Sequence, residues 1–247
     1  MVRQVSEKLL SQTTAEWDAL APVRFRQISS GDDISYNRVI APAVLSLVGP
    51  LRPSKILDAG CGTGLFTIQL AEIAGEIVGV DPSAKSIEIA RGLGTRTKFL
   101  QETIEEFSLS SGLSFDVVVA NMVLMDALCL ESFLVACKRL MAPQGALIFS
   151  ITHPCFWPQH YGYASSSWFR YEDELLIEAP FRITADQNVP LVSTHVHRPL
   201  SSYITSFVSA GFSLKELKEP VPPPDVDAAY RRLWKFPRYI VGRCVGY

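Results

Sequence analysis

Three glycines at every second position follow a short apolar strand and form the chemically most informative part of the chain. They belong to Asp58-Ala-Gly-Cys-Gly-Thr-Gly64, directly after Lys55-Ile-Leu57. Glycine adopts positive φ without steric cost, and it lets a ligand lie against bare backbone. A glycine turn between a strand and a helix also gathers backbone N–H groups beside a helix N-terminus. Residues 58–64 therefore predict a binding site for a nucleotide-like ligand.

The spacing of these glycines discriminates between possible ligands. A dinucleotide fingerprint is G-x-G-x-x-G and a P-loop requires G-K-[ST], whereas this loop is G-x-G-x-G followed by Leu65. The carboxylate of Asp58 would repel a pyrophosphate and would favour a cation such as an amino-acid ammonium. Asp81 lies 21 residues after Gly60, where a carboxylate can accept hydrogen bonds from both ribose hydroxyls. A ligand with a ribose, an ammonium and no phosphate is S-adenosylmethionine, and a nicotinamide dehydrogenase is disfavoured.

Strands and helices alternate through most of the chain. Expected strands occupy residues 55–59, 76–80, 97–101, 115–120, 146–151, 213–219 and 239–245, and expected helices occupy 65–74, 83–93, 103–107, 130–141 and 200–210. This alternation is typical of βαβ units in a doubly wound sheet. We therefore expect an α/β fold with a mostly parallel seven-stranded sheet.

Two segments depart from the alternation. Residues 1–50 predict an N-terminal helical cap, with helices over 13–21 and about 34–48 and a kink or break at Pro42. Residues 51–247 predict a Rossmann-like domain, interrupted after its fifth strand by an insertion that covers the substrate. The insertion spans residues 153–199, with strand candidates at 168–171, 181–184 and 191–197.

The ordered motifs resemble the class I S-adenosylmethionine-dependent methyltransferases. They are the glycine loop, Val78-Gly-Val-Asp81 and Phe115-Asp-Val-Val-Val-Ala-Asn121, and the resemblance covers residues 55–151. Further segments, Ile151-Thr-His-Pro-Cys-Phe156 and His197-Arg-Pro-Leu-Ser-Ser-Tyr203, look like a subgroup that methylates small molecules. The resemblance implies an enzyme that uses S-adenosyl-L-methionine as its cofactor.

The resemblance also implies where the cofactor contacts the chain. The glycine loop would pass beside the methionyl part, Asp81 would hold the ribose, the turn at Thr103 would bracket the adenine, and Asn121 would lie near the methionyl group. Many relatives carry Asp at the position of Thr103, so Thr103 or Glu102 would have to replace that acceptor. The expected cofactor-binding residues are Tyr36, Asp58, Gly60, Gly62, Gly64, Asp81, Pro82, Thr103, Ile104 and Asn121.

Several of these residues also have a purely structural interpretation. Asp81 followed by Pro82 suits the start of a helix. Thr103 suits a helix cap, and Asn121 suits a turn at the end of a strand. Tyr36 suits a buried position on a helix face.

Three histidines are the candidate catalytic residues. His153 follows the fifth strand, whose carboxyl end faces the ligand in doubly wound sheets. His195 and His197 share one face of an expected strand. An imidazole is a base with a pKa near neutrality, although a carboxylate acceptor would need no base. Each histidine also suits a structural role, and no metal site is expected because His195 and His197 lack a third ligand.

The composition excludes several partner classes. The chain has 247 residues, 48% of them hydrophobic, and a net charge of −2, which gives no general attraction for nucleic acid or an anionic membrane. The basic cluster Arg231-Arg-Leu-Trp-Lys235 with Arg238 is more simply a solvated face. No apolar run is long enough for a membrane span, and residues 1–20 contain no long apolar run of the kind that a secretory signal needs. Five scattered cysteines suggest reduced thiols in the cytoplasm.

We therefore expect a cytoplasmic methyltransferase, monomeric or homodimeric, that acts on a small molecule and binds neither nucleic acid nor membrane. An oxygen acceptor, hydroxyl or carboxylate, is favoured because no Asn/Asp-Pro-Pro-aromatic motif for planar amino groups follows strand 115–120. The alternatives are N- or C-methylation of a small molecule or peptide, a non-catalytic S-adenosylmethionine-binding regulator, and a nucleic-acid methyltransferase.

Overall fold

The computed structural model describes residues 1–95, 97–228, 230 and 233–247. Its strands are β1 (Arg3–Val5), β2 (Lys55–Ala59), β3 (Glu76–Asp81), β4 (Lys98–Gln101), β5 (Phe115–Asn121), β6 (Met141–Thr152), β7 (Leu175–Pro180), β8 (Val192–His197), β9 (Phe212–Lys218) and β10 (Tyr239–Gly246). Its helices are α1 (Leu10–Ser29), α2 (Ala41–Val48), α3 (Leu65–Ala71), α4 (Ala84–Arg91), α5 (Ile104–Ser110), α6 (Leu130–Leu140), α7 (Trp157–Tyr161), α8 (Leu200–Ser209) and α9 (Pro224–Asp227), with a π-helix over Tyr36–Ile40 and a 3₁₀ turn over Gly49–Leu51.

The larger sheet has seven strands in the order β4-β3-β2-β5-β6-β10-β9. Strands β2 to β6 run parallel, and β10 runs antiparallel to both β6 and β9. The central strand β5 is almost wholly apolar, as a strand covered on both faces must be. This sheet confirms the expected α/β fold.

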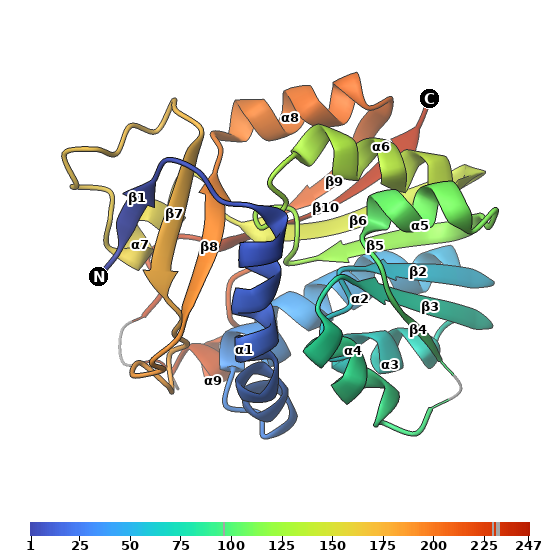
Figure 1. The fold of residues 1–247 in the computed structure, drawn as a ribbon, viewed down its shortest axis with the longest axis horizontal. Coiled ribbons are helices and arrows are strands. Elements are labelled where there is room, and N and C mark those ends of the chain that lie inside the picture. The colour runs from blue at the N-terminus through green and yellow to red at the C-terminus, as the bar shows by residue number, and fades with distance from the viewer. Residues whose placement is uncertain (96, 229, 231–232) are drawn as a thin grey trace.

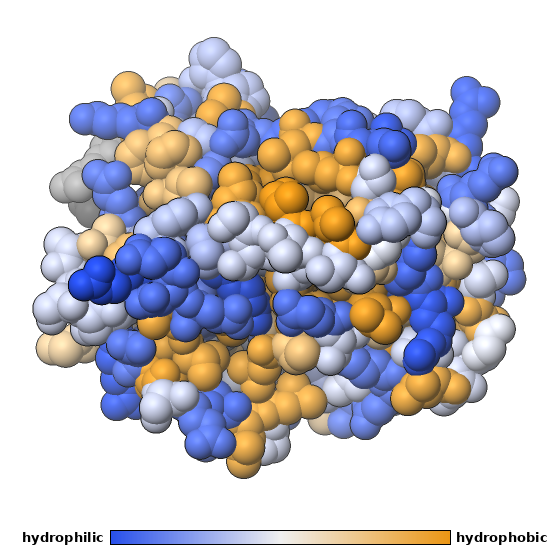
Figure 2. Space-filling view, turned by 90° about the horizontal axis from the view of Figure 1, so that it is seen from above, coloured by the Kyte–Doolittle hydropathy of each residue, from blue (hydrophilic) through white to orange (hydrophobic). Residues whose placement is uncertain are grey.

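Helices cover both faces of the larger sheet (Figure 1). Because strand side chains alternate between faces, Ile56 of β2 packs into the cluster with α2 and α3, while Leu57 packs into the cluster with α5, α6 and α8. Figure 2 views the molecule from above Figure 1, the side on which α6 and α8 lie, and this face carries both hydrophilic and apolar residues. Among the described residues, no helix combines the length and hydropathy that crossing a membrane requires.

The N-terminal helices differ from the expectation at their ends. The first helix was expected to end before Pro22, but α1 continues through this residue to Ser29. A proline inside a helix removes one hydrogen bond, and the burial of Leu20 and Ala21 beside it offsets that loss. The irregularity expected at Pro42 is a π-helix, which ends at Ile40, two residues before this proline.

A second, three-stranded antiparallel sheet has the order β1-β7-β8. The strand expected at 191–197 is confirmed as β8, whereas those expected at 168–171 and 181–184 are wrong. The strand is Leu175–Pro180 instead, because its alternate side chains are buried. Tyr163 stacks on Trp168, which therefore belongs to a packed turn. Strand β1 pairs with β7, so the N-terminal segment and the insertion share one sheet.

Candidate functional site

A cavity of about 540 Å³ lies at the carboxyl ends of the parallel strands, beneath α1. Its size is within the range of small-molecule sites. Helix α1 stands between the large sheet and the three-stranded sheet (Figure 1) and contacts both α4 and β8. The expected cofactor-binding residues that line the cavity are Tyr36, Gly60, Gly62, Asp81, Pro82, Thr103, Ile104 and Asn121. Eight of the ten expected residues are thus brought to one cavity.

The three glycines of the loop all have positive φ but serve different purposes. A Cβ at Gly60 would lie 2.6 Å from the Val123 side chain, and one at Gly64 would lie 2.8 Å from the Phe99 ring. A Cβ at Gly62 would meet no described heavy atom within 4 Å. Gly62 therefore leaves space for a ligand, whereas Gly64, which is not among the lining residues, permits close packing beneath the loop.

Asp81 is held in place by two backbone N–H groups. Gly62 donates to its Oδ2 atom over 2.9 Å, and Ser83 donates to its Oδ1 atom over 2.8 Å. Burial raises the pKa of Asp81 to about 6, and these two hydrogen bonds oppose the rise. Each carboxylate oxygen retains acceptor capacity for a ligand hydroxyl.

Asp58 lies beneath the glycine loop rather than on the cavity wall. Its side chain accepts a hydrogen bond from the Thr67 hydroxyl over 2.6 Å, and the residue is 1% exposed. Burial raises its pKa to about 7. A direct contact with a ligand is therefore not available to Asp58 in this arrangement.

Tyr36 and Asn121 form one end of the cavity through a fixed chain of hydrogen bonds. The Asn121 amide donates to the Tyr36 hydroxyl over 3.0 Å, and the Ser150 hydroxyl donates to Asn121 Oδ1 over 2.6 Å. Burial raises the pKa of Tyr36, so its phenol stays neutral at physiological pH. These contacts fix the orientation of the Asn121 amide.

Thr103 is a helix cap as well as a lining residue. Its hydroxyl accepts from the Glu106 N–H over 3.1 Å and donates to the Glu106 carboxylate over 2.9 Å. The Glu106 carboxylate also accepts from the Thr103 N–H, which completes a capping box. The hydroxyl is thus engaged within the protein, and its expected contact with an adenine amino group stays a prediction.

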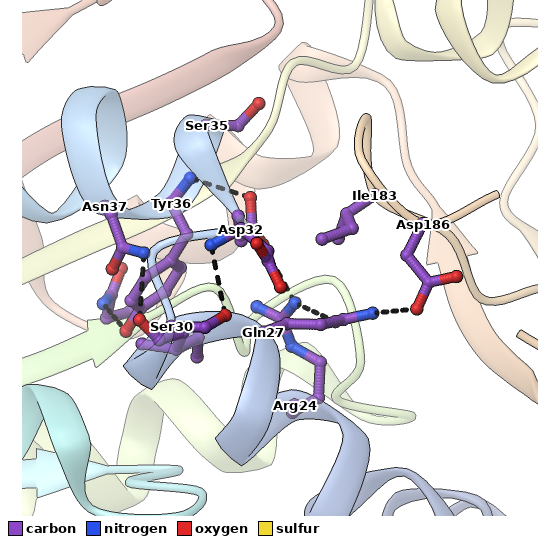
Figure 3. Close-up of polar contacts among 12 residues, drawn as sticks. Arg24, Gln27, Ser30, Asp32, Ser35, Tyr36, Asn37, Ile183 and Asp186 are labelled. Atoms are coloured by element: carbon purple, nitrogen blue, oxygen red, sulfur yellow. Dashed lines mark hydrogen bonds and ion pairs between the residues drawn. The ribbon is translucent and has the colours of Figure 1, made fainter.

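Arg24 lines the cavity, although no sequence motif predicted it as a site residue. It is the cationic side chain among the described lining residues. Its Nη1 atom donates to Asp33 and to Gln27, each over 2.9 Å, and Gln27 donates in turn to Asp186 over 3.2 Å (Figure 3). The guanidinium carbon lies 5.8 Å from the centre of the Tyr36 ring. Arg24 therefore brings positive charge beside Tyr36.

The described residues that line the cavity include none of the three candidate catalytic histidines. His153 is 2% exposed, and its Nε2 atom lies 2.6 Å from Glu219. His195 Nε2 lies 3.3 Å from the Tyr163 hydroxyl, and burial lowers the pKa of His195 to about 4. His197 Nε2 donates to the Tyr171 carbonyl over 3.0 Å. All three histidines have structural partners within or beside the insertion.

The insertion packs against elements that line the cavity, and the described lining residues include none from the insertion itself. Thr194 of β8 donates to Glu16 of α1 over 3.1 Å. Val196 donates to the Met125 carbonyl over 2.7 Å in the loop that follows β5. Arg198, which is 2% exposed, donates to three carbonyls of the same loop, those of Leu124, Ala127 and Leu128. The insertion thus fixes two walls of the cavity, α1 and the β5–α6 loop.

The expected basic cluster is only partly described. Arg231 and Arg232 lie outside the described residues. Arg238 is buried, with its guanidinium 4.1 Å from the centre of the Trp234 ring, so the interpretation as a solvated face is wrong for this residue. Among the described residues, no group of three or more His, Cys, Asp or Glu side chains is arranged to hold a metal ion.

The comparisons with known proteins agree with the fold and the loop. Residues 57–149 match the family described as "Methyltransferase domain". These residues are therefore similar to a methyltransferase domain. The mitochondrial ubiquinone biosynthesis O-methyltransferase of Mus musculus is 36% identical over 108 residues, which are 41% of this chain and 29% of that protein. The chain thus matches less than a third of the length of that curated relative.

Solved structures extend the methyltransferase likeness to most of the chain. An S-adenosylmethionine dependent methyltransferase from Mesorhizobium loti has a TM-score of 0.65 at 20% identity, covering 83% of this chain and 96% of that chain. The 1,6-didemethyltoxoflavin-N1-methyltransferase of Burkholderia thailandensis was solved with bound 1,6-didemethyltoxoflavin and S-adenosylhomocysteine. It has a TM-score of 0.61 at 17% identity, covering 99% of this chain and 94% of that chain. At these identities the likeness establishes the fold of the methyltransferase domain and its surroundings.

Proposed function

We propose that the chain binds S-adenosyl-L-methionine in the cavity beneath α1 and transfers its methyl group to a small molecule. The observation that carries this proposal is the pairing of Gly62 with Asp81. Gly62 leaves open space at the cavity, while its N–H fixes a carboxylate that still has acceptor capacity. A ribose needs such an acceptor next to bare backbone.

The remaining cavity residues complement the other parts of the cofactor. Pro82 and Ile104 offer apolar surface to an adenine ring. Arg24 supplies a cation for the carboxylate of the methionyl part. Its bonds to Asp33 and Gln27 both use Nη1, so its Nη2 and Nε groups can donate to that carboxylate. Asp58 adds negative potential from beneath the loop that favours the ammonium and the sulfonium. Tyr36 and Asn121 line the same end of the cavity as Arg24.

When bound, the cofactor supplies a methyl group that is already activated by its positive sulfur. The protein aligns the acceptor and excludes water. Helix α1 serves the second purpose, because Asp18 accepts from the Ser83 hydroxyl over 2.6 Å and from the Lys85 N–H over 2.9 Å. These bonds fasten α1 over the cavity.

An oxygen acceptor is our first choice, in keeping with the name of the ubiquinone biosynthesis O-methyltransferase. Nitrogen is the alternative, in keeping with the N1-methyltransferase that shares the fold. A nucleic-acid substrate is less compatible with a cavity that α1 covers. The cytoplasmic location and the monomeric or homodimeric state stay predictions.

A screen with methyl-labelled S-adenosylmethionine tests this function. Hydroxyl, carboxyl and amine compounds are offered as acceptors to the wild-type protein and to Gly62→Val. The proposal expects label in at least one class with the wild-type protein and none with the variant, whose added side chain would project into the open space beside Gly62. Label in no class, combined with tight binding of S-adenosylhomocysteine, would favour a non-catalytic regulator instead.

A further inference from the structure

Asp126 is an acidic residue on the cavity wall that neither the sequence motifs nor the proposed cofactor contacts explain. It lies in the loop between β5 and α6, next to Val123, Ala127 and Leu128, which also line the cavity. Its backbone N–H donates to the Val123 carbonyl over 2.9 Å, so the loop turns at this point. The insertion holds this loop through Val196 and Arg198.

The Asp126 side chain differs from other acids near the cavity. Asp81 accepts two backbone N–H groups, and Asp18 accepts from Ser83 and Lys85. Within the described part of the chain, the Asp126 carboxylate has no hydrogen-bond donor. It is therefore available to a ligand in the cavity.

The charges that face Asp126 come from three elements. They are Glu16 of α1, Asp81 at the end of β3, and Arg198 after β8. Burial, together with the carboxylates of Glu16 and Asp81, raises the pKa of Asp126 well above its usual value, and the Arg198 guanidinium opposes the rise. Glu16 also has a buried Oε2 atom without a partner among the described residues. This wall of the cavity favours a cation or a proton.

We propose that Asp126 forms an ion pair with the cofactor sulfonium and accepts the proton of a neutral hydroxyl acceptor during methyl transfer. This proposal rests on the proposed function. Asp126 takes the proton as the O–H bond breaks, the acceptor oxygen bonds the methyl carbon, and the C–S bond breaks. The positive sulfonium and the negative carboxylate disappear together, which leaves a neutral thioether, a methyl ether and a protonated Asp126.

The same charges decide between the acceptor classes. A carboxylate acceptor would be repelled by Asp126 and Asp81, which line the cavity. Glu16 lies behind this wall and pairs with Lys8. A hydroxyl carries no charge, and it needs the base that Asp126 provides. Between these two classes, the cavity therefore serves the neutral hydroxyl.

Calorimetric binding of S-adenosylmethionine and of S-adenosylhomocysteine tests the ion pair without any acceptor. Only the first ligand is a sulfonium, so Asp126→Asn should weaken it about tenfold, as expected from one unit of pKa coupling, and leave the second unchanged. In the wild-type protein, S-adenosylmethionine should bind more tightly as pH rises, and Asp126→Asn should weaken this dependence, whereas the part that comes from Asp58 and Asp81 remains. Glu131→Gln is the control, because Glu131 follows the same loop but bonds Ser206 outside the cavity.

Methyl transfer to a hydroxyl acceptor completes the test. Asp126→Asn should lower kcat by about 10²–10⁴, the usual contribution of a positioned base, and Asp126→Glu should restore part of it. Equal effects of Asp126→Asn on both ligands, or none on either, would overturn the ion pair. If the wild-type protein binds neither ligand, the proposed function itself fails, and that result is distinct from a loss of discrimination at Asp126.

Discussion

The backbone N–H of Gly62 donates a 2.9 Å hydrogen bond to the carboxylate of Asp81, and both residues line the cavity. This contact joins the glycine loop after β2 to the acid that ends β3, two segments that the parallel register places side by side. The binding surface is therefore built before a ligand arrives. Such preorganisation reduces the entropy that binding must overcome.

Gly62→Ala should abolish or strongly weaken binding of S-adenosylhomocysteine. Its Cβ would project into the ligand space, and its φ of +52° adds backbone strain of about 1 kcal/mol. Gly112 is the matched control, because it has a φ of +61° and no described heavy atom within 4 Å of a Cβ, but it does not line the cavity. Gly112→Ala should lose similar stability in urea denaturation and retain full affinity. Equal loss of affinity in the two variants would contradict the role of Gly62.

Arg24→Met should separate the amino-acid end of the ligand from its nucleoside end. S-adenosylhomocysteine carries the carboxylate that Arg24 is proposed to bind, whereas 5′-methylthioadenosine lacks it. The variant should bind the first compound about 10–100-fold more weakly, the range expected for a hydrogen bond to a charged group, and the second compound unchanged. Competition binding of the two compounds measures this. Parallel weakening of both would mean that the variant disturbs the cavity as a whole.

Asp58 and Asp81 should each lower the stability of the ligand-free protein as pH rises from about 4 to about 7. Burial raises their pKa values from 3.8 to about 7 and about 6, so each binds more protons in the folded state than in the unfolded state in this window. Their contribution to the free energy of unfolding therefore decreases with pH, by roughly 1.4 kcal/mol per unit of pKa difference. His160 and His195, whose pKa values burial lowers to about 4, oppose this trend, so urea denaturation at pH 5 and pH 8 compares the wild-type protein with Asp58→Asn. The stability of the wild-type protein relative to the variant should be lower at pH 8 than at pH 5, and an equal or higher relative stability at pH 8 would contradict the assignment.

His153→Gln should retain methyl transfer within about threefold, because His153 contacts Glu219 and the cavity does not reach it. The variant should instead lose on the order of 1 kcal/mol of stability through its weakened hydrogen bonds. Transfer rates and urea denaturation of the same preparation measure both quantities. A loss of kcat by more than a hundredfold, with stability unchanged, would restore His153 as a catalytic candidate.

Eight of the ten expected residues line one cavity because they depend on local patterns, and their contact with a cofactor stays a prediction. Glycines at strand ends, an acid after the second strand and a capping threonine are each fixed by neighbouring residues. Strand β2 has the expected bounds for the same reason. The carboxyl ends of parallel strands then place these loops at one edge of the sheet.

The covering side could not be predicted in the same way, since it depends on contacts between distant segments. Arg24 was not predicted as a cavity residue because the first helix was expected to end before Pro22. The residues Trp17, Ala21, Arg24 and Ile28 recur at helical spacing, and all four line the cavity. Asp126 follows no motif, and its raised proton affinity comes from Glu16 and Asp81, which are far from it in sequence. His153 was expected at the site because it follows the fifth strand, and His195 and His197 because they share one face of a strand in the insertion.

Calorimetric titration of S-adenosylhomocysteine tests the central claim most directly. The wild-type protein should bind one equivalent, and Asp81→Ala should weaken binding by at least tenfold, because the ribose loses its acceptor. Asp116→Asn is the control, since Asp116 also accepts two backbone N–H groups, those of Ser54 and Lys55, but does not line the cavity. This control should bind as the wild-type protein does. No binding by the wild-type protein, or undiminished binding by Asp81→Ala, would contradict the account.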